Sequence, residues 1–430
     1  MTFDPSEARD DHGKWTKGGS GGYDALTVNS FLNGPQLAKI GSRNTSDIAK
    51  DLNARGQEAL KALGIASGQI NPPAKGDDPA QTAKASNIVS SAIASEIEDE
   101  MSRKGDTHAD DWYTSKVKDA MGVAEKMHPE MAGNPGAKFA FTAAMAVTSQ
   151  GETVPNNTRL ADGAYEVFAK TGKFPTDVVS QDPSSMNGNF AKLNTLIDQL
   201  GVKGTQAFLD KEFTVGELTK MGYRVGGEAV NTKVYGSAIM GPKIGQGFYQ
   251  NLNGNFKPLT ADMWFMRGWG RLTGTLTGTT DMTKPTARFV AALKAEGKPV
   301  PKTQEEMVLQ ARDIRLENDR YFQSHKKEDG PVRAKTELIF AADRLDQAAN
   351  GVRDMPTSSG QRSYMRDVFS QAQEKLKEAG HNMTIADMQA TWWYPEKRLY
   401  TRMGARDTDR INVDYATALR DLAGKKGLTI

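Results

Sequence analysis

The chain has 430 residues, enough for two or three domains or for one large helical body with appendages. Its composition, 38% hydrophobic, 8% aromatic and 25% charged, is typical of a soluble globular protein, and its net charge of +2 does not force a nucleic-acid partner. It contains no cysteine, which excludes disulfides, thiolate catalysis, cysteine-ligated zinc and iron–sulfur clusters.

Residues 1–33 are polar and rich in turn-forming residues, and the Gly-Gly-Ser-Gly-Gly run at 18–22 has the composition of a flexible linker. We therefore expect a flexible N-terminal segment that is dispensable for folding. Within it, residues 8–16 read ARDDHGKWT and resemble the R-D-x-x-G-[KR]-[WF] segments of tailed-phage head proteins. This short match indicates a phage origin.

Residues 34–130 are predicted to form an N-terminal helical region. Helical patterns at 34–70 and 84–128 are separated by an interruption at 72–79 that contains Pro, Gly and Asp. In the second pattern the apolar residues fall mostly at helical spacing and share one face, which predicts that this face is buried.

Residues 131–290 alternate short helical runs with Gly, Pro and Asn turns, and strand patterns are sparse, so this block is predicted to be a compact all-α domain. Near its start, the run from 137 to 150 is apolar on nearly every face and is expected to be a buried helix. The run ends at Gln150, and a polar loop with Asn156 and Asn157 follows. This loop either contacts DNA or carries ordinary helix caps.

The sequence Gly241-Pro242-Lys243-Ile244-Gly245 begins a further helical run. Proline suits the first helical position because it has no N–H and a fixed φ. The glycines allow close backbone approach and leave amides free for a phosphate oxygen. Lys243 is therefore either an ordinary solvated lysine or an amine presented to a ligand at a helix N-terminus.

Asp262 begins the next helical run, nineteen positions after Lys243 (262 − 243). An aspartate there acts as an N-cap, which contributes roughly 1 kcal/mol. The lysine and the aspartate, each at a helix N-terminus and joined by one short helix, could also converge on one cleft. Such a pair suits cleavage of an N-glycosidic bond, with an amine to attack the sugar carbon and a carboxylate to stabilise the cationic transition state.

The segment 233–271 around this pair is locally basic. Asp262 is its only acidic residue, whereas its basic residues are Lys233, Lys243, Lys257, Arg267 and Arg271. The local charge favours a polyanionic partner even though the whole chain is nearly neutral.

Residues 303–430 are predicted to form a C-terminal helical region. Thr384 and Asp387 resemble a capping pair at the start of one of its helices. The aromatic and basic run at 388–398 either stacks on bases or, as we expect, packs onto the middle block. The amphipathic patterns in this region cover 304–327, 332–349, 361–379, 384–402 and 411–424.

The histidines and the apolar stretches of the sequence limit which cofactors and which cellular location are expected. The five histidines lack ligand spacing, so neither a metal site nor another cofactor is expected. No apolar stretch reaches about 18 residues, and no signal peptide opens the chain. We expect no membrane partner and a location in a host cytoplasm or a phage virion interior.

Together these motifs resemble the helix-hairpin-helix DNA glycosylase superfamily, which includes endonuclease III and 8-oxoguanine DNA glycosylase. That family has an apolar helix ending in S-Q with an asparagine-containing segment behind it, a hairpin of the form L-P-G-V-G-x-K-x-A, and V-D-x-H-x-x-R about 19 residues later. The matching segments here are Ser149-Gln150 with Asn156 and Asn157, the hairpin at 241–245, and the run at 261–267.

The sequence departs from the family pattern at several positions. The first Pro and Gly of the family's hairpin are Ala238 and Ile239 here, Gly245 replaces the final alanine, and Trp264 replaces the histidine that follows the aspartate. The cysteine cluster of the endonuclease III branch is absent, so the branches without a cluster are the more similar ones.

The resemblance implies an all-α fold, with a helix-hairpin-helix glycosylase-like core and N- and C-terminal helical extensions. It implies a DNA glycosylase, with or without AP-lyase activity, that extrudes a damaged or modified base from double-stranded DNA. Lys243 would attack C1′ of the sugar, and Asp262 would stabilise the oxocarbenium-like transition state. The positions implied in DNA binding are Gly241, Gly245, Gln150, Asn156, Asn157 and Arg267.

A non-catalytic role is the alternative. The protein would then be a phage virion-interior or ejected protein that keeps a glycosylase-like core for contact with DNA, and other virion components would be its partners. The phage-like segment at 8–16, the absence of cysteine and the altered hairpin favour this alternative.

Overall fold

A computed structural model describes residues 23–32, 45–65, 78–103, 111–180, 183–278, 281–324, 336–405 and 413–429. This part of the chain is mostly helical, which confirms the predicted all-α class. Its one sheet is a two-stranded antiparallel ribbon that pairs Phe213 with Val234, formed by β1 (Glu212–Thr214) and β2 (Lys233–Tyr235). Among the described residues, no helix has the length and apolar character needed to span a membrane.

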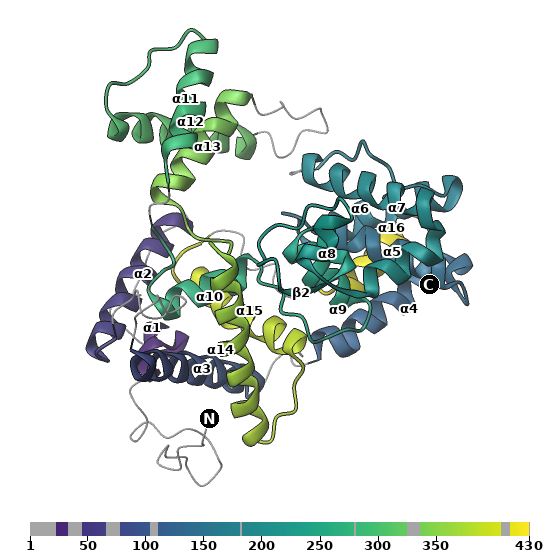
Figure 1. The fold of residues 1–430 in the computed structure, drawn as a ribbon, viewed down its shortest axis with the longest axis horizontal. Coiled ribbons are helices and arrows are strands. Elements are labelled where there is room, and N and C mark those ends of the chain that lie inside the picture. Colours follow the sequence, from purple (N-terminus) through teal and green to yellow (C-terminus); the bar gives the residue numbers. More distant parts are fainter. Residues whose placement is uncertain are drawn as a thin grey trace.

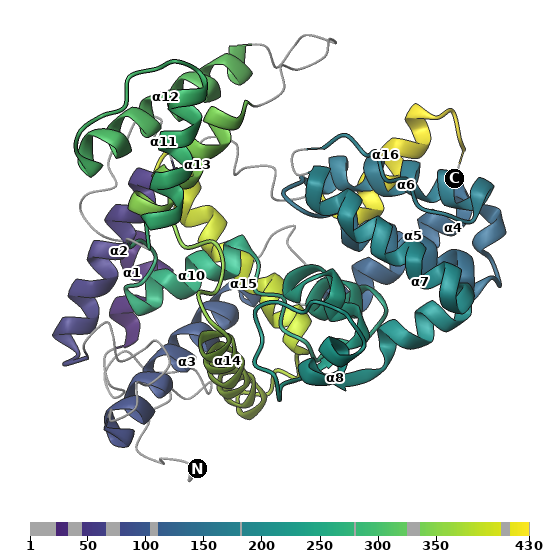
Figure 2. The same cartoon turned by 45° about the horizontal axis from the view of Figure 1, so that its top comes forward.

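The helices form two lobes and a projecting arm, as Figures 1 and 2 show. We call the lobe that contains the middle of the chain the central lobe, and a single hydrophobic cluster runs through it. Its elements are η3 (Trp112–Lys116), α4 (Val117–Met127), η4 (Pro129–Met131), α5 (Pro135–Thr148), α6 (Val154–Thr171), α7 (Pro183–Asp210), α8 (Val215–Lys220), η5 (Gly236–Met240), η6 (Pro242–Tyr249), α9 (Gln250–Leu252) and α16 (Tyr415–Lys425).

Helix α5 lies at the heart of the central lobe. Asn134 caps it by accepting a hydrogen bond from the amide of Ala137, and Pro135 occupies its first position. From Phe139 to Thr148 every residue is buried, because α6, α7 and η6 pack around the helix. The predicted buried helix is confirmed.

The second lobe, which we call the outer lobe, joins helices from both ends of the chain. Helix α3 packs against α14 and α15, and α10 packs against α2 and α15. Helix α10 lies within the predicted 131–290 block but packs in this lobe, and α16 returns from the C-terminal region to the central lobe, so the packing crosses the predicted boundaries. The elements of the outer lobe are η1 (Tyr23–Leu26), α1 (Val28–Leu32), α2 (Thr45–Ala62), α3 (Pro79–Met101), α10 (Met263–Thr273), α14 (Ser359–Glu378) and α15 (Ile385–Arg402).

A three-helix arm projects beyond α2 (Figure 1). It consists of α11 (Thr283–Ala295), α12 (Gln304–Ser324) and α13 (Glu337–Asn350). The arm has a small hydrophobic cluster of its own, in which Phe289, Leu293 and Leu345 are fully buried. It is therefore a separately packed unit attached to the outer lobe.

Helix α15 connects the two lobes. Thr384 caps it by accepting a hydrogen bond from the amide of Asp387, as predicted. Ala390 belongs to the cluster of the central lobe, whereas Met388 and Trp392 belong to a cluster of the outer lobe. Side chains on this helix are thus placed at the junction of the lobes.

The prediction that residues 1–33 form a dispensable linker is wrong for residues 23–32. Tyr23, Leu26 and Phe31 are buried, since hydrophobic residues far along the chain pack over them. The carbonyl of Leu26 also accepts a hydrogen bond of 2.6 Å from Arg271. Residues 1–22, with the phage-like segment at 8–16, lie outside the described part of the chain.

Replacing Leu26 with alanine should test this docking. Because Leu26 is fully buried, Leu26→Ala is expected to lower the free energy of unfolding by about 2–5 kcal/mol, measured by chemical denaturation. Ser30 lies exposed on α1 and supplies the control, Ser30→Ala, which should change stability by less than about 0.5 kcal/mol. Equal stability of the two variants would show that residues 23–32 do not belong to the folded body.

Candidate active site

The hairpin that carries Lys243 consists of η5, Gly241 and η6. Gly241 has a φ of 103°, which favours glycine, and the chain then enters η6 with Pro242 at the first position and Lys243 at the second. The predicted helix start is confirmed. A methyl group on Gly241 would meet open space, but the amide of Gly241 donates to the carbonyl of Ala238 at 2.9 Å, so the expectation that this amide is free for a phosphate is corrected.

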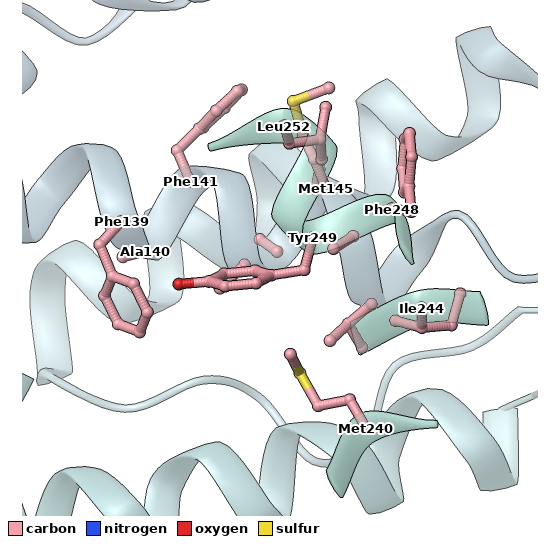
Figure 3. Close-up of a cluster of buried hydrophobic side chains, with 14 of the residues drawn as sticks. Phe139, Ala140, Phe141, Met145, Met240, Ile244, Phe248, Tyr249 and Leu252 are labelled. Carbon is pink, nitrogen blue, oxygen red and sulfur yellow. The ribbon is translucent and has the colours of Figure 1, made fainter. Parts of the chain in front are cut away.

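The buried side of η6 fixes the hairpin to the central lobe. Figure 3 shows Ile244, Phe248 and Tyr249 of η6 among the side chains of α5. The rings of Tyr249 and Phe139 meet edge to face, with centroids 6.4 Å apart. Lys243 therefore belongs to a helix whose buried side is packed on the central lobe.

Gly245 has a structural reason to be glycine. A Cβ atom there would lie 1.7 Å from the carbonyl oxygen of Ser237, so only glycine allows η5 and η6 to pack this closely. Its amide donates to the carbonyl of Gly241 at 2.9 Å. The expectation that this amide binds a phosphate is therefore corrected. The amides of Lys243 and Ile244, in the first turn of η6, lack an acceptor within the helix.

Asp262 is the N-cap of α10. Its Oδ1 atom accepts a hydrogen bond of 2.8 Å from the amide of Phe265, as the sequence predicts. The side chain of Trp393 is a further hydrogen-bonding group that acts on this carboxylate and lowers its pKa. The aspartate therefore caps the helix with one oxygen and keeps part of its surface accessible to solvent.

Lys243 and Asp262 interact electrostatically in the structure. Burial raises the pKa of Asp262, while the nearby charge of Lys243 acts in the opposite direction. Lys243 belongs to the central lobe, and α10 packs in the outer lobe. The charge of Lys243 therefore acts on Asp262 from an element of the other lobe, and Asp262 keeps part of its surface accessible to solvent.

A second lysine, Lys397 of α15, also acts on Asp262. Burial lowers the pKa of Lys397, whereas the charge of Asp262 raises it. Three aromatic rings surround the ammonium group, with centroids 5.6 Å away for Trp393, 5.8 Å for Trp264 and 5.9 Å for Tyr394. Sequence reasoning missed this lysine, although the aromatic and basic run at 388–398 is the signal that contains it.

Arg267 lies five residues after Asp262 (267 − 262), on the helix that Asp262 caps, and is mostly enclosed. Its Nε atom is 3.1 Å from Oδ1 of Asp354, and its guanidinium lies 4.7 Å from the ring centroid of Trp264. Burial raises the pKa of Asp354, and the charges of Arg267 and Lys243 oppose this shift. The charge of Lys243 therefore acts on both Asp262 and Asp354, and Asp354 pairs with Arg267.

Asn157, one of the predicted DNA contacts, is a structural link. Asn157 is only 1% exposed. Its Oδ1 atom accepts from the hydroxyl of Thr148 at 2.6 Å, and its Nδ2 atom donates to the hydroxyl of Tyr415 at 2.7 Å. These bonds tie α5, α6 and α16 together, which corrects the expectation that Asn157 touches a base.

Gln150 and Asn156 lie nearer the surface of the central lobe. The hydroxyl of Ser185 donates to Oε1 of Gln150 at 2.7 Å. The guanidinium of Arg159 donates to Oδ1 of Asn156 at 2.8 Å. No bond among the described residues connects either side chain to Asp262, so their predicted role in DNA binding stays a prediction.

Arg271 is unavailable to DNA, which corrects the expected basic surface at 233–271. It is 1% exposed and donates hydrogen bonds to the carboxylates of Glu96 at 3.0 Å and Glu396 at 2.8 Å.

No group of three or more His, Asp or Glu side chains suited to a metal ion occurs within the described ranges. Comparison with protein-family models, curated proteins and solved structures finds no match for this chain.

Proposed function

We propose that this protein is a DNA glycosylase that extrudes a nucleotide from duplex DNA and cleaves its N-glycosidic bond. The observation that carries the proposal is that the charge of Lys243, at the start of η6, acts on the carboxylate of Asp262, the N-cap of α10. These are the amine and the carboxylate that the reaction uses. The resemblance of 241–245 and 261–267 to glycosylase motifs supports the same function.

In the proposed reaction the neutral amine of Lys243 forms a bond to C1′ while the bond from C1′ to the base breaks. The base leaves with the electron pair and takes up a proton, and the attached amine loses one. The carboxylate of Asp262 stabilises the positive charge that develops on the sugar. Opening of the sugar ring then gives an imine between Lys243 and C1′.

Lys397 acts in this scheme as a positioning residue. Its charge opposes the effect of burial on Asp262 and so favours the ionised carboxylate at neutral pH. The aromatic rings of Trp264, Trp393 and Tyr394 hold the ammonium group next to the site. The tryptophans, both partly exposed, also offer flat faces for an extruded base.

Borohydride trapping tests the role of Lys243. Reduction of the imine should link the wild-type protein covalently to a substrate duplex, and Lys243→Gln should abolish this adduct while DNA binding changes little. Lys397→Gln is the matched variant and should still form the adduct. An adduct that survives in Lys243→Gln but disappears in Lys397→Gln would make Lys397 the nucleophile. Base excision without any adduct would leave Asp262 to activate water in a monofunctional enzyme.

The pH dependence of excision tests the role of Lys397. Because burial raises the pKa of Asp262 above its ordinary value of 3.8, excision should fall as the pH drops through this raised pKa and the carboxylate becomes protonated. Lys397→Gln removes a charge that lowers the same pKa, so the acid limb should move to higher pH. Single-turnover rates between about pH 4 and pH 8 would measure the limb.

Lys257→Gln is the control for this pH profile, since Lys257 is exposed and absent from the charges that act on Asp262. Its acid limb should coincide with that of the wild type. An unshifted limb in Lys397→Gln, or an equal shift in both variants, would assign the titration to another group.

The substrate screen decides between enzyme and non-catalytic protein. Duplexes with damaged or phage-type modified bases would be incubated with the protein and assayed for released base. Release from at least one duplex is expected. Tight DNA binding without release from any of them would instead support the non-catalytic virion role.

A further inference from the structure

A cavity of about 410 Å³ lies where the arm meets the outer lobe. Its volume is within the range of roughly 300–1,000 Å³ that is typical of ligand sites. Its walls come from the start of α2, from α10, α12 and α13, and from the segment 351–355. The basic residues in the walls are Lys50, Arg267, Arg312, Arg315 and Arg344, and the acidic ones are Asp47, Asp346 and Asp354.

Six of these charged residues form three ion pairs in the described part of the chain, whereas two basic residues form none. The pairs are Arg267 with Asp354 at 3.1 Å, Arg315 with Asp346 at 2.7 Å, and Arg312 with Asp47 at the long distance of 3.9 Å. Lys50 and Arg344 have no acidic partner among the described residues, and both are exposed. The cavity therefore carries an uncompensated positive charge.

Two of the residues that line the cavity, Arg267 and Asp354, link it to the Lys243–Asp262 site. Arg267 lines it and belongs to the helix that Asp262 caps. Asp354 also lines it, and the charge of Lys243 acts on this carboxylate. A strand that places one nucleotide at Asp262 would therefore bring a neighbouring phosphate toward the cavity.

We propose that this cavity binds a phosphate group, with Lys50 and Arg344 as the residues that neutralise it. Arginine presents a planar fork of donors that matches phosphate oxygens, and lysine contributes a point charge. The phosphate comes either from the backbone of the DNA strand in the adjoining site or from a free nucleotide. The assignment of the phosphate to a DNA strand rests on the proposed function, whereas the existence of the anion site does not.

Charge reversal tests the proposal. The cavity variant carries Lys50→Glu and Arg344→Glu, and the control variant carries Lys284→Glu and Lys294→Glu, two exposed lysines of α11 outside the cavity walls. Both variants change the net charge equally. Thermal melting would confirm that each one folds, since all four residues are on the surface.

The first probe is a fluorescein-labelled duplex, and its affinity is measured by anisotropy over a range of salt concentrations. We expect the cavity variant to bind at least about tenfold more weakly than the wild type. The slope of log affinity against log salt should become shallower by roughly 2, because about two phosphate contacts are lost. The control variant should bind within about twofold of the wild type.

The second probe is inorganic pyrophosphate, measured by calorimetry at constant ionic strength. Loss of pyrophosphate binding in the cavity variant alone supports a phosphate site. If duplex binding is unchanged in that variant, the free nucleotide is the source of the phosphate. Equal losses in both variants, or no loss with either probe, would overturn the proposal. Borohydride trapping, which tests the proposed chemistry, does not measure pyrophosphate binding, so the two ideas can fail separately.

Discussion

Replacing Asp262 with asparagine is expected to slow base excision about a thousandfold while the protein stays almost as stable as the wild type. The amide oxygen of asparagine can still accept the hydrogen bond from Phe265, and asparagine caps helices as well as aspartate does. The variant lacks only the negative charge that stabilises the sugar cation, an effect of about 4 kcal/mol on the barrier. Single-turnover excision and thermal denaturation would measure the two quantities.

Asp78 supplies a matched control for the capping role. It is the N-cap of α3, where its side chain accepts from the amide of Ala80 at 3.0 Å. Asp78→Asn should change neither excision nor stability appreciably. Undiminished excision in Asp262→Asn would remove Asp262 from the site and leave it as a helix cap alone. A large loss of stability in that variant would instead assign the effect to the fold.

Replacing Arg271 with leucine is expected to lower the free energy of unfolding by about 3–5 kcal/mol. Arg271 is enclosed by the carboxylates of Glu96 and Glu396, both buried, and by the carbonyl of Leu26. Without the guanidinium, two carboxylates remain buried with no cation between them. Urea denaturation, followed by circular dichroism, would measure the loss.

Two further variants identify the cause of that loss. Arg288 forms an exposed ion pair with Glu337, and Arg288→Leu should cost at most about 1 kcal/mol. Adding Glu96→Gln and Glu396→Gln to Arg271→Leu removes the unpaired charges and should restore part of the stability. A cost below about 1 kcal/mol for Arg271→Leu, or no recovery in the triple variant, would contradict the buried-charge explanation.

The sequence by itself determined the class of the fold and the local form of the site. Apolar periodicity marks α5 and the C-terminal helices because burial of one helix face leaves a repeating pattern in neighbouring residues. Helix caps are equally local, so the starts of helices at Pro242, Asp262 and Thr384 could be predicted. A lysine and an aspartate at two helix starts follow from these signals.

Only the tertiary structure decided which segments share a core. Helix α10 leaves the middle block for the outer lobe, and residues 23–32 dock against helices far along the chain. Burial across such distances leaves no periodic signal in a short polar segment, so the carbonyl of Leu26 as a partner of Arg271 could not be predicted. The same limit applies to Gly245, whose contact with Ser237 depends on how two short helices cross.

The composition of the site is also a tertiary property. Lys397 lies 135 positions after Asp262 (397 − 262), yet its charge acts on that carboxylate because α15 passes along the junction of the lobes. Asn157 shows the opposite case. It was expected to contact DNA, but the structure buries it between three helices. The local sequence sets the position of a residue in its helix. Long-range packing sets which groups surround its side chain and how far water is excluded, and these surroundings determine its chemistry.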